Sequence, residues 1–86
     1  MTLPQLRRHI DRLDRRLLRL LNQRAQVVRR IRQLKRRKGL RPVDPARERA
    51  ICARLAAENP GPLTAESVAA IYRVIIRQSR RSAQSG

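Results

Sequence analysis

A positive charge interrupts an apolar stripe in the first part of the chain. Apolar residues recur there in steps of four and three, and this rhythm meets a charge at Arg24. A guanidinium in a buried stripe costs on the order of several kcal/mol unless an anion pairs with it. Lys35 follows at a helical offset of roughly 20° around the axis and roughly 16 Å along it. Two cations on one face could therefore hold a small acidic molecule. The stripe consists of Leu6, Ile10, Leu13, Leu17, Leu20, Val27, Ile31 and Leu34.

The residue types leave other interpretations open. The stem of Arg24 could pack in the stripe while its head extends into water or pairs with a carboxylate in the core. Asp44, Arg47 and Glu48 follow a connector that must return the chain toward the second half of the first helix, although a solvated helical turn would look similar. Ser79 extends an apolar stripe near the C-terminus, where a buried serine commonly bonds the carbonyl one turn earlier.

Arg7 lies too far from Arg24 to share a ligand with it in the same chain. On one helix the two residues would be roughly 25 Å apart and roughly 100° out of phase. In an antiparallel dimer of long helices, however, Arg7 of one subunit would approach the middle of the other subunit's helix.

Three helices are predicted to position these side chains. The first covers residues 4–37 and ends in a basic turn followed by glycine. The second covers residues 45–58, because Asp44 followed by proline is a helix start and the segment NPGP is a stop. Thr64 caps a third helix that continues to about residue 82.

The first predicted helix is too long to be covered by the rest of its own chain. It would extend roughly 50 Å, which exceeds the width of a compact domain of this size. The 86 residues form one domain at most, near the size at which a single chain buries barely enough apolar surface. We therefore predict an all-α fold, in which residues 1–86 form a single domain of one long, one short and one medium helix. Two such protomers would form an intertwined helical homodimer.

The composition narrows the class of protein. There are 22 Lys and Arg against 6 Asp and Glu, a net charge of +16 that attracts nucleic acid, acidic lipid and small polycarboxylates alike. No apolar run has the length of a membrane span or the form of a signal peptide. The lone Cys52 cannot form an intramolecular disulfide, which favours a cytoplasmic protein, and a single histidine does not favour a conventional zinc site.

The order of these segments resembles the all-helical family of chorismate mutases. The resemblance covers Leu6 to about Ala83 and rests on LRRHIDRLDRRLLRLLNQR, then Lys35, then PVDPARE, then IIRQS. It implies the [3,3] rearrangement of chorismate to prephenate in aromatic amino acid biosynthesis, without a metal or other cofactor. It also implies an intertwined dimer with two active sites, each completed by an arginine from the other subunit.

The resemblance assigns roles to the polar residues. Arg24 and Arg7 of the partner subunit would hold the two carboxylates of chorismate, and Lys35 would donate to the ether oxygen of the breaking bond. The family usually has a glutamine four residues after the serine, which shares that ether oxygen, but position 83 is alanine here. Gln84 stands about 100° further round the helix. Either the last turn is distorted enough to bring Gln84 in, or Ser82 or a water substitutes, or the second donor is lacking.

The remaining polar residues would complete the site on the same resemblance. Glu48, together with the backbone at Asp44, would bind the ring hydroxyl of the substrate. Arg47 and Ser79 would complete the polar wall near the carboxylates.

Two other functions stay open at this stage. The charge of +16 and the segment RRIRQLKRRK would also suit a helical dimer that binds nucleic acid, at least nonspecifically, although aromatic stacking residues are nearly absent. A protein of the mutase fold could instead act on isochorismate or aminodeoxychorismate, or lack strong activity. Glu48 suits the ring hydroxyl of chorismate and so favours the mutase.

Overall fold

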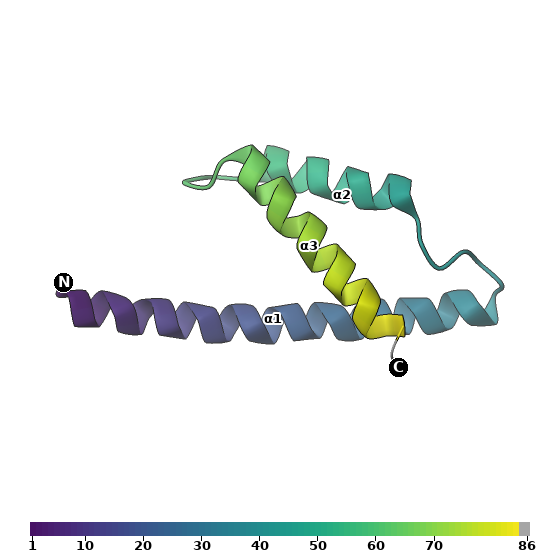
Figure 1. Ribbon diagram of the computed structural model, residues 1–86, viewed down its shortest axis with the longest axis horizontal. Helices are drawn as coiled ribbons and strands as arrows, with labels where there is room; N and C mark the ends of the chain where they lie inside the picture. Colours follow the sequence, from purple (N-terminus) through teal and green to yellow (C-terminus); the bar gives the residue numbers. More distant parts are fainter. Residues whose placement is uncertain (85–86) are drawn as a thin grey trace.

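Three helices make up the computed structural model, which describes residues 1–84 (Figure 1). They are α1 (Leu3–Arg37), α2 (Pro45–Glu58) and α3 (Ala65–Gln84). The molecule measures 55 × 27 × 15 Å, and α1 runs along its longest dimension. The prediction of one long, one short and one medium helix is confirmed, with α3 extending two residues beyond its expected end.

The start of each of the two shorter helices is set by a side chain. Asp44 Oδ1 accepts a hydrogen bond of 3.1 Å from the backbone N–H of Arg47, and Pro45 occupies the first turn of α2. Thr64 Oγ1 accepts one of 3.0 Å from the backbone N–H of Ser67. Both caps agree with the prediction. The cap at Asp44 matters for the site, because it fixes the first turn of α2 beside the connector.

Helix α3 makes the contacts that join the other two helices. It packs against both α1 and α2, whereas α1 and α2 do not pack directly against each other within residues 1–84. In Figure 1, the first turns of α3 lie beside α2, and the helix then runs diagonally to the C-terminal half of α1. The side chains buried in this arrangement are few: Cys52, Val68, Ile76, Ser79 and Ala83.

The apolar stripe of α1 is not buried by its own chain. Every side chain from residue 1 to residue 23 is exposed, and burial on α1 begins at Arg24. Leu6, Leu17 and Leu20 are 44%, 55% and 59% exposed. Val27, Ile31 and Leu34 of the second half are also 52%, 48% and 45% exposed. This exposure agrees with the expectation that the rest of the chain does not cover the first helix. No helix within residues 1–84 is long and apolar enough to cross a membrane.

Candidate active site

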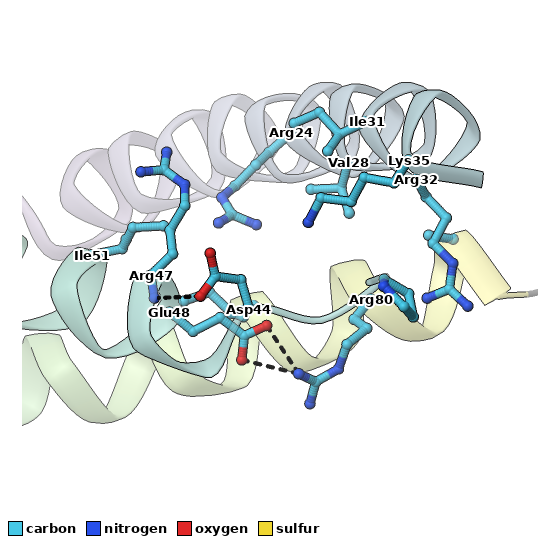
Figure 2. A pocket seen from close by; sticks show the side chains of 13 residues that line it. Arg24, Val28, Ile31, Arg32, Lys35, Asp44, Arg47, Glu48, Ile51 and Arg80 are labelled. Atoms are coloured by element: carbon cyan, nitrogen blue, oxygen red, sulfur yellow. Dashed lines mark hydrogen bonds and ion pairs between the residues drawn. The ribbon is translucent and has the colours of Figure 1, made fainter. Parts of the chain in front are cut away.

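A cavity of about 170 Å³ is lined by residues of α1, the connector, α2 and α3 (Figure 2). Its lining combines apolar side chains with a cluster of charged ones. Five of the charged side chains are basic and two are acidic, so the lining carries a net positive charge. The charged lining residues are Arg24, Arg32, Lys35, Asp44, Arg47, Glu48 and Arg80.

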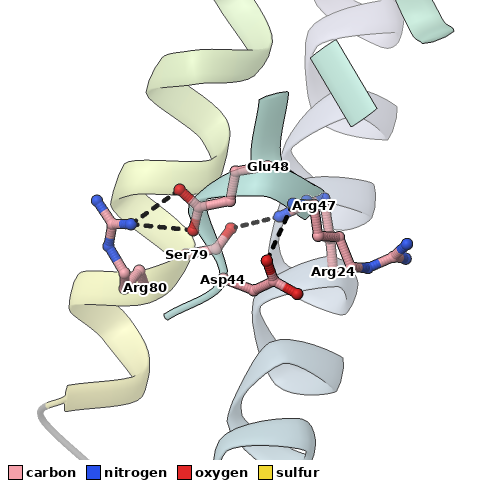
Figure 3. A network of polar contacts seen from close by, with 6 residues as sticks. All are labelled: Arg24, Asp44, Arg47, Glu48, Ser79 and Arg80. Carbon is pink, nitrogen blue, oxygen red and sulfur yellow. Dashed lines mark hydrogen bonds and ion pairs between the residues drawn. The ribbon is translucent and has the colours of Figure 1, made fainter. Parts of the chain in front are cut away.

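Arg24 is half-buried and does not extend freely into water. Its Nη1 donates a 3.0 Å hydrogen bond to Oγ of Ser79, which is only 6% exposed (Figure 3). Because the acceptor is neutral, this bond orients the guanidinium without cancelling its charge. Ser79 is not among the residues that line the cavity, and it contacts the cavity's Arg24 through this bond. Its part in a polar wall stays a prediction.

Lys35 lies on the same wall of the cavity as Arg24. Both side chains are half-buried, and Figure 2 shows both reaching from α1 into the hollow. The shared face predicted from their spacing is confirmed. The side chain of Lys35 has no hydrogen-bond or ion-pair partner among residues 1–84, so its ammonium group is available to a bound anion.

The first turn of α2 forms the opposite wall. Asp44, Arg47 and Glu48 all line the cavity, so the connector does return the chain to the second half of α1 as predicted. Asp44 uses one carboxylate oxygen as the cap of α2, and the guanidinium of Arg47 belongs to an exposed side chain. Glu48 is half-buried and faces both the cavity and α3.

Arg80 is a site residue that the sequence analysis missed. Its Nη1 lies 2.9 Å from each carboxylate oxygen of Glu48, and the two side chains are 31% and 30% exposed. The residues stand 32 positions apart on different helices, so no periodicity connects them. Only the packing of α3 against α2 reveals the pair.

Arg32 was missed as well, for a different reason. It lines the cavity from α1, and its Nε is buried without a hydrogen-bond partner among the described residues. A helical offset of about 80° from Arg24 places it at the edge of the same face. That signal is present in the sequence, but it is hidden within the dense basic segment RRIRQLKRRK.

The C-terminal turn of α3 settles which residue faces the cavity. Ala83 lines the cavity and is 3% exposed, while Gln84 is exposed and lies outside the lining. Ser82 is exposed and borders a different groove, against α1. Because α3 stays a regular helix through Gln84, no distortion rotates that side chain inward. The structure therefore brings neither Gln84 nor Ser82 to the cavity.

Arg7 lies outside this cavity, in the exposed first half of α1. This agrees with the expectation that it cannot contact the ligand of its own chain. Within residues 1–84, no three His, Cys, Asp or Glu side chains gather as a set of metal ligands. The cavity thus combines side-chain cations, which can bind an anion, with the Glu48 carboxylate, which can accept a hydrogen bond.

Known proteins resemble this chain along nearly its whole length. The family model for chorismate mutase type II matches residues 6–84. The chain is 40% identical over 78 residues to the bifunctional chorismate mutase/prephenate dehydratase of Aquifex aeolicus. That alignment covers 86% of this chain but 22% of the relative, so the chain spans about a fifth of that protein's length.

Solved structures agree with the family match. Form I of the chorismate mutase from Thermus thermophilus has a TM-score of 0.86 at 39% identity, covering 88% of this chain and 95% of that one. Form II has a TM-score of 0.91 at 37% identity, covering 94% of this chain and 92% of that one. Sequence and fold thus point to the same conclusion: the chain belongs to the type II chorismate mutase family.

Proposed function

We propose that the protein is a chorismate mutase, which converts chorismate to prephenate on the route to phenylalanine and tyrosine. The observation that carries this proposal is the cavity in which Arg24 and Lys35 face Glu48, in a chain of this family. The reaction is an intramolecular [3,3] rearrangement and requires neither a nucleophile nor a redox step. The protein must hold a flexible dianion in a compact conformer and stabilise charge on the ether oxygen, tasks of positioning and electrostatics.

The cations of α1 take the acidic parts of the substrate in this proposal. Arg24, held by Ser79, binds one carboxylate through its remaining N–H groups. Lys35 donates to the ether oxygen, where negative charge grows as the bond breaks. Its ammonium group is well suited to this, because no residue within 1–84 already pairs with it. A donor that acts mainly in the transition state raises turnover more than it tightens binding.

The wall formed by α2 orients the ring. Glu48 accepts a hydrogen bond from the ring hydroxyl, with the backbone at Asp44 beside it, and Arg47 lies near the carboxylates. Gln84 has no part in this arrangement, because it is exposed and outside the cavity lining. The methyl group of Ala83 at that position offers no donor.

The active unit we propose is a homodimer of one-domain protomers in the cytoplasm. Arg7 of the partner subunit would bind the second substrate carboxylate in each site. The exposed leucines of the first half of α1 support this assembly, since they form an apolar face that a second copy could cover. The lone cysteine supports a reducing compartment.

The direct test is to mix the purified protein with chorismate and follow the loss of its ultraviolet absorbance. Prephenate formation is expected, and the catalytic efficiency should fall with ionic strength because the positive protein attracts a dianion. Absence of turnover would contradict the proposal. Release of pyruvate from isochorismate or aminodeoxychorismate, in place of prephenate formation, would assign the cavity to a related lyase.

A second candidate function rests on the charge of +16. A protein that binds nucleic acid through such a surface would be retained on DNA with a steep dependence on salt. This observation would favour nucleic-acid binding only if chorismate turnover were absent. Weak nonspecific retention alongside turnover would be a side effect of the basic surface.

A further inference from the structure

We propose that Arg80 is a positioning residue that keeps the Glu48 carboxylate on its own wall of the cavity. In that place Glu48 can accept a hydrogen bond from the substrate without occupying the cations that the substrate needs. The inference rests on the proposed function, because it concerns how the same cavity receives chorismate. Arg80 was not among the residues expected from the sequence.

The geometry of the contact leaves Glu48 able to bind a ligand. A single nitrogen, Nη1 of Arg80, lies 2.9 Å from Oε1 and 2.9 Å from Oε2, so it donates to both oxygens of Glu48 (Figure 3). An ionised carboxylate offers about four lone-pair sites. Arg80 uses one on each oxygen, and each oxygen retains one for the ring hydroxyl.

The composition of the cavity explains why Glu48 must be held. Arg24 and Lys35 line the opposite wall, and neither is neutralised by a carboxylate in residues 1–84. Glu48 carries an opposite charge on a flexible stem in the same hollow. A freed carboxylate would be attracted to those cations and would compete with the carboxylates of the substrate. Arg80 prevents this by providing a closer partner that points away from them.

Helix α3 positions both walls through two successive residues. Ser79 accepts a hydrogen bond from Arg24, and Arg80 donates to Glu48 (Figure 3). The two side chains leave α3 about 100° apart, and α3 packs against both α1 and α2. One turn of α3 thus sets the position of a cation on one wall and of a carboxylate on the other.

A double-mutant cycle tests the inference. Arg80→Ala and the control Arg77→Ala are compared in the parent and in a Glu48→Gln background, by steady-state kinetics with chorismate. Arg77 is a suitable control, because it is an exposed arginine one turn earlier on α3 that does not line the active cavity. Arg80→Ala should raise KM roughly ten- to hundredfold in the parent, within the range of coupling seen for residues in contact. Its effect on kcat should be smaller, and Arg77→Ala should change neither constant by more than about twofold.

The Glu48→Gln background supplies the decisive comparison. An amide has no charge to be attracted to Arg24 or Lys35, so Arg80→Ala should change KM there by less than about twofold. The conservative Arg80→Lys should recover part of the parental KM, since an ammonium group can still donate to Glu48. Circular dichroism of each variant verifies that the helices are intact, and Arg80→Lys decides the matter if Arg80→Ala does not fold.

Two results would overturn the role of Arg80. One is an Arg80→Ala variant with the same KM as Arg77→Ala. The other is an equal fold-change of KM in both backgrounds, which would mean that Arg80 acts independently of Glu48. In both cases the parent still turns over chorismate and the proposed function stands. A parent without any turnover would instead refute the proposed function, and the role of Arg80 with it.

Discussion

The two halves of α1 share one apolar rhythm but lie in different surroundings. In the first half every side chain is exposed, including Leu13 at 40% and Leu17 at 55%. In the second half, Arg24, Val28 and Lys35 are half-buried and line the cavity beneath α3. The comparison teaches that the contact with α3 half-buries Arg24, Val28 and Lys35, while the apolar stripe itself stays exposed along both halves of the single chain.

The two halves of α1 are suited to different roles. An apolar face of this length is unusual on a monomeric protein, and burying one leucine side chain contributes roughly 1.5–3 kcal/mol. The first half of α1 is therefore suited to assembly. The second half carries the cations of the site and is suited to chemistry. Arg7 is the proposed link, because it lies in the first half and would act on the cavity of the other subunit.

The largest effect is expected from a charge placed in the exposed stripe. Leu13→Glu would introduce a carboxylate where two copies of α1 are proposed to meet, and burying an unpaired charge costs on the order of several kcal/mol. We expect loss of the dimer together with most of the activity. Size-exclusion chromatography with light scattering, at several protein concentrations, would measure the change in mass.

Gln26→Glu is the matched control for that variant. It adds the same charge on the opposite face of α1, at an exposed position that lines no part of the active cavity. Its mass and activity should equal those of the parent. A Leu13→Glu protein that keeps the mass of the parent would show that the first half of α1 does not mediate assembly.

Lys35→Ala should have a different effect from Leu13→Glu: the dimer should remain, and turnover of chorismate should fall. Removing one donor to a developing negative charge typically lowers turnover roughly hundred- to thousandfold. The mass and helix content should stay those of the parent, because the side chain of Lys35 forms no hydrogen bond or ion pair within residues 1–84. Steady-state rates with chorismate measure the loss. A near-parental rate would exclude Lys35 from the reaction.

The proposed action of Arg7 on the cavity of the other subunit can be tested by combining two defective subunits. Arg7→Ala alone should cost about 2 kcal/mol of substrate binding, roughly thirtyfold in kcat/KM. A heterodimer of one Arg7→Ala and one Lys35→Ala subunit, purified through two different tags, would contain one intact site and one site with both defects. It should recover about half of the parental turnover per dimer. A heterodimer no more active than the Arg7→Ala homodimer would mean that Arg7 does not act across the interface.

The smallest effect is expected at Ser79. Ser79→Ala removes the neutral acceptor of the Arg24 hydrogen bond but leaves the guanidinium in the cavity. Because Arg24 keeps its charge and loses only one orienting contact, we expect a loss of about 1 kcal/mol, roughly fivefold in kcat/KM. Steady-state kinetics together with thermal unfolding would separate this loss from a general loss of stability. A fall comparable to that of Lys35→Ala would show that Ser79 contacts the substrate directly.

Much of the fold could be predicted because helix signals are local. The proline and cap at the start of α2 and the glycine after α1 act over a few residues, and the observed helix ends lie within two residues of those predicted. The pairing of Arg24 with Lys35 followed from the rotation per residue of a single helix. The role of Gln84 was left open, and the regular last turn of α3 turns it away from the cavity.

The rest of the site depends on contacts between helices. The bond between Arg24 and Ser79 joins residues 55 positions apart, and that between Glu48 and Arg80 joins residues 32 apart. No spacing rule connects positions on different helices, so Arg80 could not be recognised and the bond between Arg24 and Ser79 was not predicted.

The amino-acid sequence by itself determined three helices, their ends, and the face of α1 that carries two cations within an apolar stripe. Each of these follows from backbone geometry that repeats every few residues. Only the tertiary structure decided that α3 crosses the second half of α1 and leaves the first half uncovered. It also decided which side chain meets which across the cavity. The physical reason is that such contacts depend on the angle and offset at which helices pack, and these are set by all the contacting side chains together.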